Sequence, residues 1–170
     1  MTSETPVGYT RLQIVLHWAV VILVVVQFLL GPTMTVATKA LLAGEAAPAN
    51  PLAWAHILVG SLILIFAAWR VGLRFANGTP ATTFEPKTAE QEFLVFLTRE
   101  LSFFLYLTIF VIPVMGLVGW FYQNSIAATV HANMKILLIA VVSAHVAIVL
   151  FQQFGLRDDA FQRMRKPRQD

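Results

Sequence analysis

The sequence predicts an all-α membrane protein, a four-helix transmembrane up-and-down bundle, and three observations support this fold class. Hydrophobic residues make up 58% of the 170 positions and charged residues only 12%, about half the charged fraction of soluble domains. The mean hydropathy is +0.72. Four apolar runs each reach the roughly 20 residues that a bilayer-spanning helix needs. We therefore expect residues 1–170 to form a single transmembrane domain.

Each predicted helix is bounded or marked by helix-breaking residues. Pro32 stops the first, Pro51 precedes the second, and Pro113 lies inside the third. The first run is longer than the apolar core of a signal peptide, so we expect it to remain in the mature chain. The connections are short enough for antiparallel neighbours. The four helices are expected at about 12–31, 52–75, 101–122 and 132–154.

The distribution of Lys and Arg predicts the orientation of the bundle. Ten of the twelve basic residues fall in the two tails and the second connection, on one side of the predicted membrane. Only Lys39 and Lys135 fall on the other side. Cytoplasmic segments carry the excess of basic residues, so both termini are expected to be cytoplasmic. Because these residues flank apolar runs and form no single stripe, no nucleic-acid partner is expected.

All four histidines lie within or beside apolar runs, where polar side chains are costly and usually functional. His17 lies roughly 9 Å beyond Arg11, and His145 roughly 10 Å from Gln152, so both lie toward the inner side. His56 follows Pro51 closely and His131 opens the fourth helix, so both lie toward the outer side. The histidines thus form an inner pair and an outer pair.

The interval between His131 and His145 predicts what the two pairs bind. Fourteen residues correspond to roughly 21 Å along a helix and a rotation of only about 40°. Both side chains therefore face the same way at different depths. A haem iron takes axial ligands on both faces of the porphyrin, and imidazole is a standard ligand. Two haem b groups would use all four histidines: His17 with His145 inside, and His56 with His131 outside.

The positions of the histidines also allow roles other than haem binding. A single membrane histidine more often makes an interhelical hydrogen bond, and a haem-free structural membrane protein would need no more. Zinc or copper also binds imidazole, but the two predicted levels are too far apart for one compact site. The chain has no cysteine, which excludes thiolate ligands and cysteine-bound iron–sulfur clusters.

Further residues are candidates for haem contact. Gly60, one turn after His56, and Gly116 in the third helix would let a flat macrocycle approach the backbone; ordinary helix packing is the alternative. Arg70 and Arg74 could pair with haem propionates, although membrane anchoring would also explain them.

Several motifs resemble the bacterial cytochrome b561 family of four-helix di-haem membrane cytochromes. The segment "RLQIVLHW" at 11–18 resembles the opening of these proteins, and the spacing of His131 and His145 matches their fourth-helix ligand pair. Weaker similarities cover most of the chain: "AHILVG", "WRVGLR", "IPVMGLVGW" and "RDDAFQRM". Gln152 and Gln153 stand where relatives often have further histidines.

The resemblance implies bis-histidine ligation by the same four residues, location in the bacterial inner membrane, and electron exchange with ubiquinone. The superoxide oxidases of this family oxidise superoxide at the outer face and reduce ubiquinone. Superoxide is an anion, so Lys135, one turn from His131, is the candidate contact for superoxide or quinone; simple snorkelling is its alternative role. A cytochrome b subunit that docks a dehydrogenase is the other functional class, and a homo-oligomer is left open.

Overall fold

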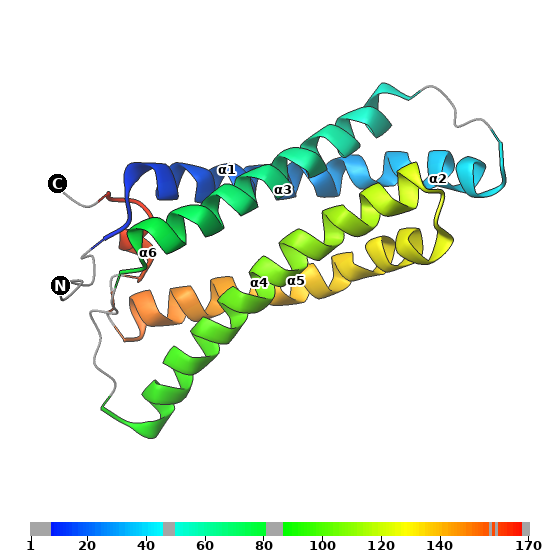
Figure 1. Cartoon of the computed structure of the whole chain (residues 1–170). Coiled ribbons are helices and arrows are strands. Elements are labelled where there is room, and N and C mark those ends of the chain that lie inside the picture. Colours follow the sequence, from blue (N-terminus) through cyan, green and yellow to red (C-terminus); the bar gives the residue numbers. More distant parts are fainter. Residues whose placement is uncertain (1–7, 46–49, 81–86, 157, 159, 168–170) are drawn as a thin grey trace.

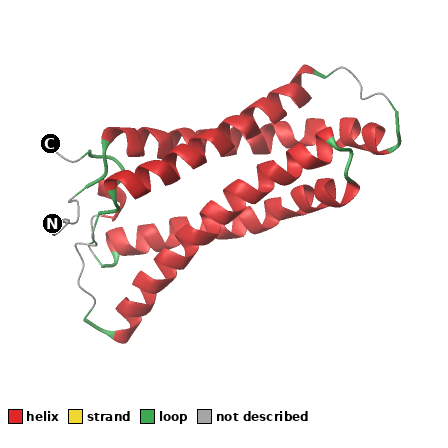
Figure 2. Cartoon of the chain, in the orientation of Figure 1, coloured by secondary structure: helices red, strands yellow, loops and turns green. Residues whose placement is uncertain are grey.

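The computed structural model describes residues 8–45, 50–80, 87–156, 158 and 160–167. Within them the chain is helical, with no strand (Figure 2). The long helices are α1 (Arg11–Leu30), α3 (Pro51–Asn77), α4 (Ala89–Phe121) and α5 (Ser125–Phe154). Three short elements complete the described chain: the 3₁₀ helix η1 (Gly31–Thr33), α2 (Met34–Leu42) and α6 (Ala160–Arg163).

The four long helices run up and down, and the start of α1 lies at the same end of the bundle as α6 (Figure 1). In the part of the chain that the structure describes, four segments are long and apolar enough to cross a membrane. Helix α1 packs mainly on α3, α4 packs mainly on α5, and the contact between α3 and α4 joins the two pairs. The predicted all-α, four-helix membrane fold is confirmed.

The bundle buries few side chains in its interior and exposes many large apolar ones. Leu16 and Val20 of α1 and Ile63 of α3 are buried. In contrast, Leu29 and Ile126 are each 74% exposed. Such a surface would be unstable in water, whereas in a bilayer the helices satisfy their own backbone hydrogen bonds and lipid covers the apolar side chains.

The first helix does not stop at Pro32 as the sequence predicted. Helix α1 passes into η1, and α2 continues the helical path to Leu42, so the apolar segment spans Arg11–Leu42. Pro32 stands in the first turn of a new helical segment, where its missing N–H breaks no hydrogen bond. Lys39 therefore lies on a helix and not in a loop.

Helices α4 and α5 begin earlier than predicted, twelve residues before Leu101 and seven before Ala132. Polar caps explain both starts, because side-chain oxygens satisfy N–H groups of the first turn. Thr88 accepts from Gln91 N, and Asn124 accepts from Ala127 N at 2.9 Å. His131 consequently lies in the second turn of α5 and does not open the helix. The connection 123–131 left between the predicted helices shrinks to a short turn before Ser125.

Candidate functional site

The outer pair of histidines meets across the bundle. His56 comes from α3 and His131 from α5, and their ring centroids lie 5.9 Å apart with an interplanar angle of 83°. A metal–imidazole bond is about 2 Å long, so two imidazoles on opposite sides of one metal ion have centroids roughly 6 Å apart. The observed separation fits two axial ligands of one iron.

The ring of His131 is held by the backbone of α4. Its Nδ1 lies 2.7 Å from the carbonyl oxygen of Ile112. A carbonyl can only accept, so Nδ1 carries the proton and Nε2 keeps a free lone pair. This orientation is usual for a metal-binding histidine, whose second nitrogen donates to a carbonyl or carboxylate. His131 therefore presents the correct nitrogen for a metal bond.

Gly116 makes this approach of His131 to α4 feasible. A Cβ atom on Gly116 would lie only 2.8 Å from His131 Nδ1. Gly119, one turn along at the same α4–α5 contact, would place a Cβ 2.9 Å from the backbone nitrogen of Ala128. Both glycines thus permit close helix packing, and Gly116 in addition leaves room for the His131 ring.

Replacement of Gly116 with alanine is expected to displace His131 and break its hydrogen bond to Ile112. We expect a loss of about half of the bound haem, confined to the outer site, measured as haem per protein after purification. Gly72→Ala is the matched control, because a Cβ there meets nothing within 4 Å. Full haem content in Gly116→Ala would show that this contact does not position a ligand.

The inner pair lies near a half-buried cationic group. His17 of α1 and His145 of α5 are close enough to interact electrostatically, and the Arg70 guanidinium of α3 acts on both. His56 and Arg70 are fourteen residues apart on α3, the same interval as that between His131 and His145 on α5. The two helices therefore place the inner and outer levels at the same separation, roughly 21 Å.

Two of the four imidazoles have unused polar atoms in the interior. Nδ1 of His17 and Nδ1 of His56 are buried and have no hydrogen-bond partner. A buried polar atom without a hydrogen bond is costly, and most buried polar atoms in proteins have a hydrogen-bond partner. Both rings can therefore still form a hydrogen bond, either with a bound group or with a protein partner that moves when that group binds.

Arg70 and Arg74 share one aromatic partner and pair with no carboxylate of the described residues. Their guanidinium carbons lie 5.7 Å and 6.0 Å from the centroid of the Tyr106 ring. Among the described residues, the ion pairs are Arg99–Glu100 and Arg163–Asp158, and neither Arg70 nor Arg74 takes part. Guanidinium groups bind carboxylates strongly, so the pair suits the propionates of a haem.

Tyr9 adds a polar group beside these arginines. Burial raises the pKa of the Tyr9 phenol above 10.0, although the Arg163 and Arg74 guanidiniums nearby oppose the shift. The phenol is therefore protonated at neutral pH and able to donate a hydrogen bond. No motif in the sequence marked Tyr9 or Tyr106, because their role depends on contacts between elements.

Two further predicted site residues have well-defined surroundings. Gly60 faces α1, where an added Cβ would lie 2.8 Å from Nε2 of Gln27. Lys135 is exposed on α5, one turn from His131, and makes no ion pair among the described residues.

The short helix α6 and the residues next to it connect α1 to α5 at the end of the bundle where α1 begins (Figure 1). Trp18 packs edge-on against His17, with ring centroids 5.4 Å apart, and its indole N–H donates to the Met164 carbonyl at 2.8 Å. Asp158 and Arg163 form an ion pair with two 3.0 Å contacts, and both side chains are largely buried. These contacts of Asp158, Arg163 and Met164 form a C-terminal clasp, which the sequence did not indicate.

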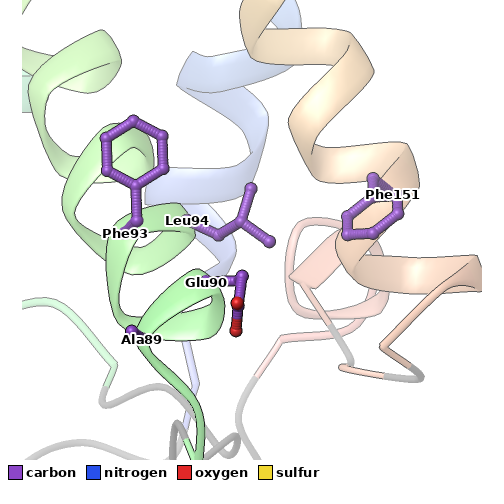
Figure 3. Close-up of a pocket in the computed structure, with 5 residues that line it drawn as sticks. All are labelled: Ala89, Glu90, Phe93, Leu94 and Phe151. Atoms are coloured by element: carbon purple, nitrogen blue, oxygen red, sulfur yellow. The ribbon is translucent and has the colours of Figure 1, made fainter.

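A pocket at the same end of the bundle contains none of the predicted ligands. It is lined by Ala89, Glu90, Phe93 and Leu94 of α4 and by Phe151 of α5 (Figure 3). Its walls are apolar apart from one carboxylate. Elsewhere in the described chain, no three His, Asp or Glu side chains gather into a metal site. The paired imidazoles suit haem, because the porphyrin supplies the remaining ligands of the iron.

Four membrane-spanning helices with two imidazoles meeting across the bundle are typical of an integral membrane protein of the b-type cytochrome class. A family model described as prokaryotic cytochrome b561 matches residues 8–167. The chain is also 36% identical over 172 residues to cytochrome b562 of Cereibacter sphaeroides, across 99% of this chain and 100% of that protein. The chain therefore belongs to the prokaryotic cytochrome b561 family, and it is a bacterial membrane protein of haem b electron transfer.

Proposed function

We propose that this chain is a di-haem cytochrome of the bacterial inner membrane that oxidises superoxide at its outer face and reduces ubiquinone, with both termini in the cytoplasm. The observation that carries the proposal is the contact between His56 and His131 across the bundle, at the depth expected for one of two histidine pairs. The outer pair has a centroid separation of 5.9 Å, and the inner pair lies beside Arg70.

In this proposal each pair of histidines binds one haem iron. His56 and His131 hold the outer haem, with His131 oriented by the Ile112 carbonyl. His17 and His145 hold the inner haem, and Arg70 and Arg74 bind propionates. When bound, haem supplies reversible one-electron chemistry at the iron, and the protein tunes its potential through ligands, burial and charge.

The proposed reaction balances with two superoxide anions for each ubiquinone. Each superoxide loses one electron and leaves as dioxygen, and ubiquinone gains two electrons and two protons. Lys135 is an exposed cation one turn from His131 on α5. With Lys39 and Glu45 it gives the outer side a formal charge of +1, which favours approach of an anion.

A single experiment separates this function from its alternatives. Purified protein in liposomes is supplied with superoxide and a soluble ubiquinone analogue, and haem reduction and quinone reduction are followed together. Coupled reduction of both supports the proposal. Haem reduction only in the presence of a co-purifying dehydrogenase would instead support a relay subunit. A preparation without a haem Soret band would exclude both functions.

Replacement of Lys135 with glutamine is expected to lower the second-order rate of haem reduction by superoxide several-fold, because one steering charge is lost. The salt dependence of the rate should weaken in parallel. Lys135→Arg keeps the charge and should react at nearly the original rate. Lys166→Gln, near the end of the chain, is the control for a general loss of charge. Equal rates in Lys135→Gln and Lys166→Gln would remove Lys135 from the proposed site.

A further inference from the structure

Gln27 is a polar side chain inside the membrane-spanning part of α1, and its polar atoms are incompletely satisfied. Its Oε1 is buried and has no hydrogen-bond partner. Its Nε2 lies against Gly60 of α3, and a Cβ added to Gly60 would lie 2.8 Å from this nitrogen. An unpaired amide oxygen in a lipid-surrounded bundle is costly, so this residue requires an explanation.

The depth of Gln27 follows independently from two helices. Gln27 is ten residues beyond His17 on α1, and Gly60 is ten residues before Arg70 on α3. Each interval corresponds to roughly 15 Å. Gly60 is in turn one turn, or roughly 6 Å, from His56. Gln27 therefore lies between the two histidine levels and nearer to the outer one.

The outer histidines differ in how their second nitrogen is satisfied. His131 Nδ1 donates to the Ile112 carbonyl at 2.7 Å. His56 Nδ1 is buried without a partner. His56 and Gly60 are four residues apart and so share a face of α3, and Gln27 packs on that face. An unpaired ring nitrogen and an unpaired amide oxygen thus occur at adjacent turns of the α1–α3 contact.

We infer that Gln27 is a positioning residue for His56: its amide oxygen accepts a hydrogen bond from Nδ1–H of His56 when the outer haem is bound. This inference rests on the proposed ligation of haem by His56. Ligand histidines nearly always donate their second N–H to an oxygen acceptor, which fixes the ring and makes it a stronger electron donor to the metal. Gly60 is then required because a side chain there would displace the amide.

The test uses the purified holoprotein in a redox titration followed at the haem α-band. Gln27→Met keeps the side-chain length and removes the acceptor. The weaker imidazole donor should favour reduced iron, so the midpoint potential of one haem is expected to rise while the other stays unchanged. Low-temperature electron paramagnetic resonance should show a shifted low-field signal for the same haem. Gln27→Glu keeps an acceptor oxygen, and its potential should return to the original value or fall below it.

Two controls separate hydrogen bonding from packing. Leu23→Met, one turn away on α1, changes packing without changing a polar group and should leave both potentials unaltered. Gly60→Ala should raise the midpoint potential of the same haem that Gln27→Met affects, because the new methyl group displaces the Gln27 amide. Unchanged potentials in Gln27→Met, or an equal shift of both haems, would overturn the inference. Fewer than two haems in the unmodified protein would instead contradict the proposed function.

Discussion

Replacement of His145 with alanine is expected to halve the haem content, leaving the outer haem with an intact bis-histidine spectrum. His131→Ala should do the reverse, because α5 supplies one proposed ligand at each of two levels roughly 21 Å apart. A pyridine haemochrome assay should give one haem per protein in each variant and two in the unmodified chain. Paramagnetic resonance would show which low-spin signal has been lost.

Two further substitutions on α5 sharpen this test. Ser143→Ala changes an exposed residue two positions from His145 and should keep both haems. His145→Met retains an axial ligand of a different kind, so the inner haem should stay bound at a raised potential, as thioether ligation favours reduced iron. If His145→Ala or His131→Ala kept both haems with bis-histidine spectra, the proposed pairing would be wrong.

Replacement of Arg163 with methionine is expected to release the C-terminal clasp. The Asp158 side chain is only 4% exposed and Arg163 only 14%. Loss of one partner of a buried ion pair costs about 3–5 kcal/mol. Detachment of this segment would remove the Met164 carbonyl from Trp18, which packs on His17. We therefore expect a lower unfolding temperature and selective loss of the inner haem on heating, followed by Soret absorbance.

Arg165→Met is the matched control for this second prediction. Arg165 is exposed and stacks on Phe161 at 5.6 Å, so its replacement should change stability little. The double change Asp158→Asn with Arg163→Met removes both charges of this ion pair and should recover part of the lost stability. Simultaneous loss of both haems in Arg163→Met would show that the clasp supports the whole bundle and not the inner site.

The bundle was predictable because a bilayer imposes a length on each apolar helix. The ends were less predictable, because capping residues extend helices beyond the apolar run. The pattern Thr88-x-x-Gln91 and the residue Asn124 before Ser125 are recognisable start signals, but apolar periodicity placed both starts later. Pro32 does not end the helical path, since proline is tolerated in the first turn of a following helical segment.

The candidate site was predictable to the extent that it follows from helix geometry. A fixed rise per residue sorted four histidines into two levels, and the structure brings His56 and His131 together. Contacts that depend on helix packing had no such signal. The Ile112 carbonyl is a backbone group without a sequence signature, and Gln27 is one amide in an apolar run. The partners of Arg70 and Trp18 likewise emerge only when distant segments meet.

The arrangement of the helix pairs also has a consequence for biogenesis. In the described helices, α5 packs closely on α4 but not on α1 or α3, although both proposed histidine pairs reach from α5 to those two helices. Haem bound as proposed would therefore act as a crosslink between two hairpins. A ligand that binds only the folded state adds its binding free energy to stability. We expect the membrane lifetime of this protein to follow the haem supply of the cell.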